Sequence, residues 1–440
     1  MPPSPLPTRA LLCAILPLAA AACIDADTPP GRAEAALASA LVAAPSGALP
    51  QAAPPRQAPP PARPRDAMPP LIRGIYVNAY AAGDPRRRAE LLALADSTEI
   101  NAFVVDVKDE DGVRYQSSLP LALEATHRKS IPIRDLAALV DTLRAHGVHA
   151  IARVVVFKDP RLSRARPEWS IQTPAGGLWR DRQGISWVSP WDPAVWEYNL
   201  DIAEEAVRAG FREVQFDYVR FPEAYRSLPR QVHPHALGER TDAIAGFLAE
   251  AGRRLRPLGA TVTADLFGLS MNESRDVGIG QQWETLSSTL DHVLPMVYPS
   301  HYFPTHLAGV PRPNRMPYET VYRSVGMGVI RNERLAAAGV EPARIVPWLQ
   351  AFTATWNDRG FPYGPAQARE QVRAVYDLGL EDWIFWHPGS DYGQVAAAFE
   401  REAESRAAPF RAPEPLSATV DRFDREGAAA ARAEAAAGQR

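Results

Sequence analysis

The feature that most constrains this chain is an eightfold alternation of short apolar runs with longer amphipathic segments. The apolar runs are rich in β-branched residues, which favours buried strands. They span residues 72–78, 102–107, 149–157, 213–219, 260–267, 292–297, 344–350 and 383–387. The amphipathic segments have the length and periodicity of helices. They span residues 85–98, 135–146, 194–209, 241–256, 283–289, 317–338, 365–378 and 392–403.

Buried strands that alternate with helices predict a parallel sheet covered by helices, an α/β fold. Eight such units that close on themselves form a (β/α)8 TIM barrel. Residues 71–403 fit its usual length of about 250 to more than 400 residues. The alternative is an open, doubly wound sheet. No G-x-G-x-x-G motif follows the first strand, so a dinucleotide site has no support, and we favour the barrel.

The distribution of proline and aromatic residues sets the limits of the folded part. Seventeen of the 43 prolines lie in residues 1–70, whereas all 37 Phe, Trp and Tyr residues follow residue 75. A proline-rich segment without aromatic residues cannot build a core. We therefore expect an extended linker over residues 24–70 and a barrel over 71–403. The tail over 404–440 is rich in Ala, Arg and Glu, which is compatible with a frayed helix or with disorder.

The first 23 residues have the pattern of an export signal. Arg9 precedes the apolar run 10–22, which ends in small residues before Cys23 and is too short to span a membrane. The segment resembles a bacterial lipoprotein signal, so Cys23 is the expected lipidation site and membrane anchor in the cell envelope. The alternative is a periplasmic or secreted protein cleaved near Ala22. Cys13 and Cys23 are the only cysteines, which excludes thiolate chemistry from the barrel.

Ionisable and polar residues collect at the ends of the predicted strands, where TIM barrels carry their active sites. The period of two places Asp106 and Lys108 on one face of the second strand. Asp217 and Asp265 interrupt the apolar fourth and fifth strands. The remaining candidates for substrate contacts are Arg153, Arg220, Tyr298, Gln350 and Trp386. The alternative for Asp217 is a structural ion pair with Arg220 or Arg153, because a buried carboxylate requires a partner.

Asp217 and Asp265 suit a two-carboxylate mechanism. Neighbouring strands lie about 4.8 Å apart, so their carboxyl groups can approach within several ångströms. Glycosidases use two carboxyl groups about 5–5.5 Å apart when they retain configuration, and about 6.5–9.5 Å apart when they invert it. One of the two must stay protonated, which burial or a like-charged neighbour achieves.

The loops at the same end of the barrel are unusually aromatic, and flat rings suit the apolar faces of sugars. Four tryptophans follow the third strand: Trp169, Trp179, Trp187 and Trp191. We expect at least two of them to be core residues and at least one to face the cleft. Further rings follow strands four to eight: Tyr225, Tyr302, Phe303, Trp356, Tyr363 and Tyr392.

Other chemistries lack support in the sequence. The net charge of −3 gives no basic footprint for nucleic acid. The histidines, among them His233 and His235, show no three-ligand spacing, so we expect no metal and no cofactor. No G-x-S-x-G elbow and no phosphate loop is present.

Four motifs in order resemble the putative glycoside hydrolase domain family, a bacterial TIM-barrel group related to the α-amylase-like clan. They are residues 73–76 (RGIY), 101–112 with VVDVKD, 157–159 (FKD) and 215–222 (QFDYVRFP). The resemblance covers nearly all of residues 71–390 and implies a sugar-polymer hydrolase with Asp217 as nucleophile. The acid of the clan is a glutamate at the end of strand five. This position holds Asp265, with Glu273 further along the loop as the alternative acid.

We therefore predict a monomeric glycoside hydrolase that cleaves an envelope or extracellular polysaccharide. In this prediction Asp217 attacks the sugar carbon or stabilises the positive charge that develops there, and Asp265 donates a proton to the leaving oxygen. Asp106, Lys108, Arg153, Arg220, Tyr298, Gln350 and Trp386 would contact the sugar or adjust these two groups. The alternative is a non-catalytic polysaccharide-binding barrel of the cell envelope.

Overall fold

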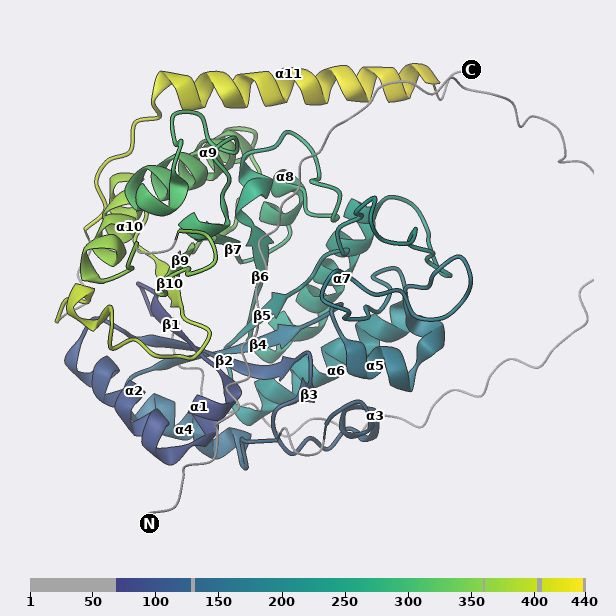
Figure 1. The fold of residues 1–440 in the computed structure, drawn as a ribbon, viewed down its shortest axis with the longest axis vertical. Coiled ribbons are helices and arrows are strands. Elements are labelled where there is room, and N and C mark those ends of the chain that lie inside the picture. The colour runs from purple at the N-terminus through teal and green to yellow at the C-terminus, as the bar shows by residue number, and fades with distance from the viewer. Residues whose placement is uncertain (1–68, 128–130, 359–360, 402–405, 438–440) are drawn as a thin grey trace, which may run out of the picture. The chain divides into compact units, whose positions relative to one another are not determined.

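Eight parallel strands close into a barrel in the computed structural model, which describes residues 69–127, 131–358, 361–401 and 406–437 (Figure 1). Around the barrel the neighbours are β1, β10, β9, β7, β6, β5, β4 and β2, and pairing of β1 with β2 closes the ring. The strands are β1 Arg73–Val77, β2 Ala102–Asp109, β4 His149–Val155, β5 Glu213–Asp217, β6 Thr261–Phe267, β7 His292–Met296, β9 Trp348–Gln350 and β10 Trp383–Trp386. The predicted (β/α)8 barrel is confirmed.

The predicted seventh strand is divided at Pro347. Its first part, β8 (Arg344–Ile345), pairs with β7, and its second part is β9. Proline has no N–H to donate to a neighbouring strand, which explains the interruption. A short additional strand, β3 (Gly112–Val113), folds back antiparallel on the end of β2.

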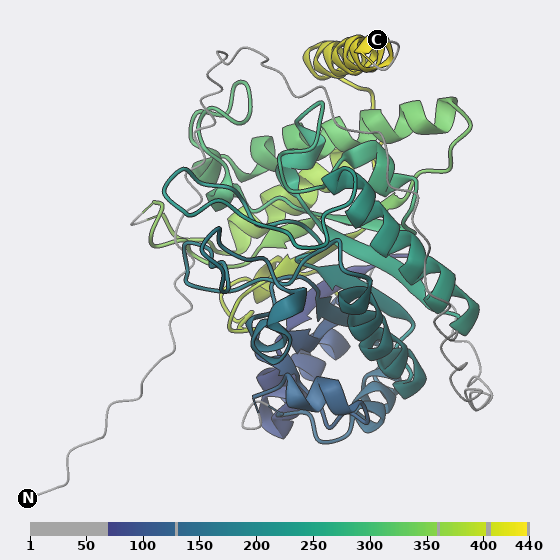
Figure 2. The ribbon, with the colours of Figure 1, turned by 90° about the vertical axis from the view of Figure 1, so that its right-hand side faces the viewer.

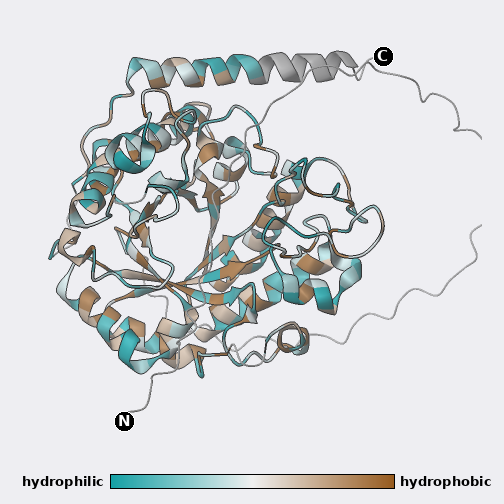
Figure 3. Cartoon of the chain, viewed as in Figure 1, coloured by the Kyte–Doolittle hydropathy of each residue, from teal (hydrophilic) through white to brown (hydrophobic). Residues whose placement is uncertain are grey.

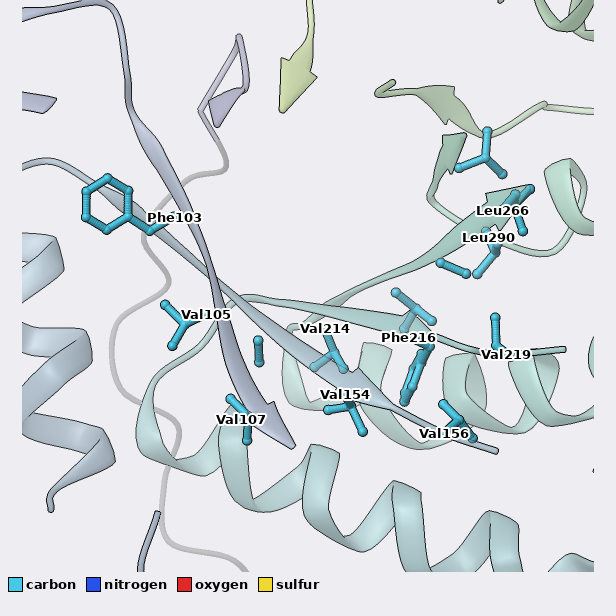
Figure 4. Close-up of a cluster of buried hydrophobic side chains, with 14 of the residues drawn as sticks. Phe103, Val105, Val107, Val154, Val156, Val214, Phe216, Val219, Leu266 and Leu290 are labelled. Carbon is cyan, nitrogen blue, oxygen red and sulfur yellow. The ribbon is translucent and has the colours of Figure 1, made fainter. Parts of the chain in front are cut away.

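The strands carry apolar residues on both faces because they separate two hydrophobic layers. Inside the barrel, Ala102, Val104 and Ile151 pack in a small cluster. The alternate residues of the same strands, such as Val105 and Val154, point outward toward the helices (Figure 4). Figure 3 shows the resulting pattern, with apolar strands at the centre and hydrophilic segments on the outer helices. This double burial explains the continuous apolar runs.

Helices cover the outside of the barrel and begin at recognisable signals. They are α1 Ala79–Gly83, α2 Pro85–Ser97, α3 Pro120–Glu124, α4 Leu136–Ala145, α5 Pro160–Ala165, α6 Pro193–Ala209, α7 Arg240–Leu255, α8 Trp283–Ser287, α9 Pro317–Ala337 and α10 Pro365–Asp377. At the start of α2, the Asp84 side chain accepts hydrogen bonds from the N–H groups of Arg86 and Arg87, and proline occupies the first helical position.

The eighth predicted helix, over 392–403, is wrong. The described part of this segment forms only a short 3-10 helix, Ala396–Ala398. Tyr392 is buried there, and its hydroxyl donates to the backbone carbonyls of Tyr76 and Phe385. The segment thus ties β1 to β10 through side-chain contacts, and an amphipathic helix is not required to cover this side.

The C-terminal residues form one long helix, α11 (Glu414–Ala437), which lies beside α9 (Figure 1). Leu416, Val420 and Phe423 are buried, and Arg334 of α9 pairs with Asp421 and Asp424. No helix in the described ranges is both long and apolar enough to cross a membrane. The predicted signal, Cys23 and most of the predicted linker lie outside the described residues.

Candidate active site

Three aspartates surround one arginine at the C-terminal ends of neighbouring strands. Arg153 of β4 donates from Nη1 to Asp106 of β2, and from Nε (3.0 Å) and Nη2 to Oδ2 of Asp217 of β5. Its Nε also lies 4.0 Å from Oδ2 of Asp265 of β6. The structure therefore brings four of the predicted site residues together. It also realises the ion pair between Asp217 and Arg153 that was the structural alternative.

The surroundings favour the protonated form of Asp265; burial also raises the pKa of Asp106. Asp265 is buried, and its Oδ1 accepts hydrogen bonds from Gln215 Nε2 and, at 2.6 Å, from Trp348 Nε1. Burial, followed by the negative charge of Asp217, raises the pKa of Asp265 well above its ordinary value. Oδ2 is left to face Asp217 and Arg153, so a proton on this oxygen points into the site.

The carboxyl groups of Asp217 and Asp265 are close enough to act on one bond. Their Oδ2 atoms lie 3.0 Å and 4.0 Å from the same Nε of Arg153, so they are separated by at most about 7 Å. This limit includes the separation of about 5–5.5 Å for retaining glycosidases and the lower end of the range for inverting ones. The geometry supports a two-carboxylate site and leaves the stereochemistry open.

The backbone after Asp217 takes an unusual conformation that positions its carboxylate. Tyr218 has a φ of 48°, in the left-handed region that non-glycine residues rarely adopt. The N–H of Tyr218 consequently donates to Oδ1 of Asp217. Strained backbone of this kind is concentrated at functional sites, where the surrounding packing maintains it. The Tyr218 ring packs edge-on against Trp187.

Aromatic rings form one wall of the site. Tyr298 and Trp386, both predicted contacts, lie with ring centroids 5.3 Å apart. Burial, followed by the charges of Asp265 and Asp217, raises the pKa of Tyr298 well above its ordinary value. Tyr298 therefore shares the electrostatic environment of the two carboxyl groups.

Lys108 does not share a face with Asp106. A β-bulge separates the two residues: Asp106 is in register with Arg153, whereas Lys108 is in register with Val154, whose side chain faces the outer helices. Lys108 is fully buried and pairs with Asp159 at 2.8 Å. The period-two prediction failed because the extra residue of the bulge reverses the direction of the following side chain.

Two other predicted contact residues have their polar groups engaged within the protein. The Arg220 guanidinium pairs with Glu223 at 3.2 Å and lies 4.4 Å from the ring of Phe267. Gln350 is fully buried; its Oε1 accepts from the Ser300 N–H and its Nε2 donates to the Phe352 carbonyl. Both side chains hold the loops around the site in place.

Glu273, the alternative acid, lies away from the carboxyl cluster. It is exposed, and its backbone carbonyl accepts a hydrogen bond from Arg331. Partial burial raises the pKa of its carboxyl group, while the nearby charges are those of Arg422 and Glu426 of α11. None of these groups belongs to the environment of Asp217. The structure therefore favours Asp265 as the partner of Asp217.

The four tryptophans of the loop after β4 differ in how far they are buried. Trp179 and Trp187 are buried, and their indole N–H groups donate to the Pro229 carbonyl and to Asp181. Trp169 and Trp191 are partly buried. At least two of the four are thus core residues, as predicted. The long loops that follow β4 and β5 lie on the same side of the barrel (Figure 2).

Sequence reasoning missed three residues that hold the cluster in place. The Tyr76 hydroxyl donates to Asp106, while Gln215 and Trp348 donate to Asp265. Tyr76 and Trp348 belong to the inner cluster. Their inward direction follows from the period of two, but their pairing across the barrel does not. No group of three or more His, Cys, Asp or Glu side chains in the described ranges is arranged to hold a metal ion.

A closed (β/α)8 barrel with neighbouring carboxyl groups at the C-terminal ends of its strands is an arrangement that fits a domain of the glycoside hydrolase type. The sequence model of the family described as "Putative glycosyl hydrolase domain" matches residues 74–392. The chain belongs to this family, as the four motifs indicated.

The solved structure of one glycoside hydrolase domain agrees with this fold. The glycoside hydrolase domain of PgaB (BpsB) from Bordetella bronchiseptica is 15% identical, with a TM-score of 0.54, over 75% of this chain and 99% of that one. A hypothetical protein from Ruminiclostridium thermocellum is 35% identical, with a TM-score of 0.40, over 44% of this chain and 97% of that one. A comparison with curated protein sequences finds no match.

Proposed function

We propose that this protein hydrolyses glycosidic bonds of an envelope or extracellular polysaccharide. The observation that carries the proposal is the unequal pair of carboxyl groups: burial and the charge of Asp217 raise the pKa of Asp265, while Asp217 accepts hydrogen bonds from Arg153 and Tyr218. A glycosidase needs one carboxyl group as proton donor and one as carboxylate. Membership in a glycosyl hydrolase family supports the same reaction.

In the proposed mechanism, Asp265 donates its proton to the oxygen of the leaving sugar as the glycosidic bond breaks. Asp217 attacks the anomeric carbon or stabilises the positive charge that develops there. Arg153 holds the Asp217 carboxylate through Nε and Nη2 and fixes its direction. Water then attacks the anomeric carbon and gives a proton to the Asp265 carboxylate, which restores the acid. Where Asp217 has formed a bond to that carbon, this bond breaks and Asp217 leaves as a carboxylate.

The test is release of reducing ends from a polysaccharide panel by the wild-type protein and by an Asp217→Asn variant. We expect release by the wild-type protein and a loss of about a hundredfold or more in the variant. Asp141→Asn is the matched control, because Asp141 is an exposed residue of the outer helix α4. Equal release by wild type and Asp217→Asn would exclude Asp217 as the nucleophile.

The second candidate is a non-catalytic polysaccharide-binding barrel. The ion pairs of Arg153 with Asp106 and Asp217 favour this candidate. Such a network can also stabilise the fold of a protein that catalyses no reaction. Binding of a polysaccharide without any release of reducing ends, equal in wild type and Asp217→Asn, would support this candidate.

We further propose that the barrel is exported and anchored through a lipid on Cys23, with a periplasmic or secreted form as the alternative. The support is the apolar run 10–22 that ends in small residues before Cys23. We expect the wild-type protein in the membrane fraction and a Cys23→Ala variant in the soluble fraction. Membrane association of both would exclude this anchor.

A further inference from the structure

A continuous row of aromatic rings leads from the carboxyl groups to the surface. It starts at Trp348, which donates to Asp265, and at Tyr76, which donates to Asp106. The rings of Tyr76 and Trp348 lie 6.5 Å apart, and the ring of Trp386 lies 6.3 Å from that of Tyr76. The residues that hold the carboxyl groups are therefore in direct contact with the start of this row.

The outer part of the row ends in an exposed indole. Phe352 meets Trp386 edge to face at 5.2 Å and stacks on Trp356 at 5.7 Å, with 21° between the planes. Trp356 is 38% exposed, whereas Phe352 behind it is 4% exposed. A single exposed apolar residue is ordinary. Trp356 differs from a single exposed residue because its ring stacks on Phe352 and continues the row of rings that begins at the carboxyl groups.

At the inner end of the row, the Arg153 guanidinium lies 5.6 Å from the centroid of Tyr76. Among the described residues, the outer rings have no such charged partner, unlike rings in the loops after β4 and β5. Arg182 lies 3.5 Å from the centroid of Tyr225, and Lys158 lies 4.5 Å from that of Tyr218. In the part of the chain that the structure describes, no cation lies over Phe352, Trp356 or Trp386. A ring face covered by a guanidinium or ammonium group cannot stack on a sugar.

Within the described ranges, the outer part of the row (Phe352, Trp356 and Trp386) also meets no positive charge that would select an acidic sugar. His301 is the basic side chain among these rings, with its centroid 6.3 Å from that of Trp356. Burial lowers the pKa of His301 to about 4, so its imidazole is neutral at ordinary pH. An apolar, uncharged wall with one exposed indole suits the C–H face of a neutral sugar ring.

We propose that Trp386 and Trp356 form a two-position binding subsite for neutral hexopyranose units, on one side of the bond that the carboxyl groups act on. The position of this subsite relative to the cleaved bond rests on the proposed function. Binding of the sugar itself does not require catalysis. Phe352 separates the two indoles, so each contacts a different sugar unit. The substrate is then a polymer of neutral sugars that binds through its ring faces.

The test measures binding by isothermal titration calorimetry in an Asp217→Asn background, where slow cleavage does not interfere. The probes are cellohexaose and maltohexaose as neutral oligosaccharides and hexagalacturonate as an acidic one. We expect at least one neutral probe to bind, and hexagalacturonate to bind at least tenfold more weakly. Adding Trp356→Ala should weaken binding of the neutral probe about tenfold or more, and Trp356→Phe should restore most of it.

Tyr322→Ala is the matched control, because it also removes one ring of a stacked pair, with Tyr318 at 5.6 Å, but on the outer helix α9. It should leave binding unchanged. The inference is overturned when neither neutral probe binds, when the acidic probe binds equally well, or when Trp356→Ala binds like its parent. Binding that depends on Trp356 in a protein that releases no reducing ends would preserve the subsite and reject only the hydrolase.

Discussion

At the N-terminal end of the barrel, Glu213 lies between two histidines, whereas at the opposite end three aspartates share one arginine. His149 Nε2 and His292 Nδ1 lie 3.0 Å and 3.3 Å from the two oxygens of Glu213. Although burial opposes it, the charge of His292 and the hydrogen bonds of both histidines lower the pKa of Glu213 to about 2. Asp265 has its pKa raised instead.

Strand β5 contributes to both clusters, with Glu213 as its first residue and Asp217 as its last. At the first end, one carboxylate is matched by two basic side chains, which satisfies its charge. At the other end, carboxyl groups outnumber the guanidinium, so one of them is favoured as an acid. The comparison distinguishes a cluster with matched charges from the one that we propose to be reactive, in agreement with the division of roles between the two ends of TIM barrels.

The largest expected effect is on the reaction. In an Asp265→Asn variant we expect kcat on a polysaccharide to fall by about 10²- to 10⁴-fold, because the proton donor is removed. The free energy of unfolding should change by less than about 1 kcal/mol, since the desolvated acid is replaced by an amide of the same shape. Steady-state kinetics and urea denaturation measure the two quantities.

The pH profile sharpens this prediction. Because Asp265 must be protonated, kcat of the wild-type protein should decrease as the pH rises through the raised pKa of Asp265. A substrate with an aryl leaving group, which needs little protonation, should lose much less activity in Asp265→Asn than the polysaccharide does. An equal loss on both substrates would contradict the role of Asp265 as the acid.

The next effect is on stability at the other end of the barrel. A Glu213→Gln variant should lower the free energy of unfolding by about 3 kcal/mol, because a buried ion pair that loses one partner leaves the other uncompensated. We expect kcat/KM to stay within about twofold of wild type. A loss of activity without a loss of stability would show that this cluster is not purely structural.

The smallest effect is the pH dependence of stability that comes from His292. Although burial opposes it, the charge of Glu213 raises the pKa of His292; Arg344 opposes this rise and Asp382 reinforces it. A raised pKa stabilises the fold below the ordinary histidine pKa of about 6.5, and this contribution is lost as the pH rises through the folded pKa. Glu213, with its lowered pKa, stabilises the fold above about 4.5 and loses this contribution as the pH falls toward 2.

A His292→Gln variant should therefore differ from wild type by about 1 kcal/mol more at pH 5.5 than at pH 8.5, as measured by urea denaturation at both values. The exposed pair of His146 with Asp96 offers a matched control, because an exposed pair contributes little. A pH-independent difference for His292→Gln would show that the His292 charge does not contribute.

Much of the fold and part of the site could be predicted from local pattern. Asp217 and Asp265 interrupt two consecutive apolar strands, and consecutive parallel strands end at the same edge of a barrel, so the two residues were expected to be adjacent. Lys108 could not be placed in this way, because a bulge of one residue changes the face of every residue after it. Gln350 also fitted the pattern, yet its side-chain amide is buried and hydrogen-bonded to the backbone of Ser300 and Phe352.

The sequence by itself determined the eightfold alternation, the four motifs of the family, and which strands carry carboxyl groups, because these follow from periodicity and residue type. Only the tertiary structure raises the pKa of Asp265, which is why we propose it as the acid. A pKa depends on burial and on charges within a few ångströms, and Arg153, Gln215 and Trp348 reach Asp265 from three other strands. The same holds for the aromatic row, whose members are contributed by β1, β9, β10 and the loop beyond β9.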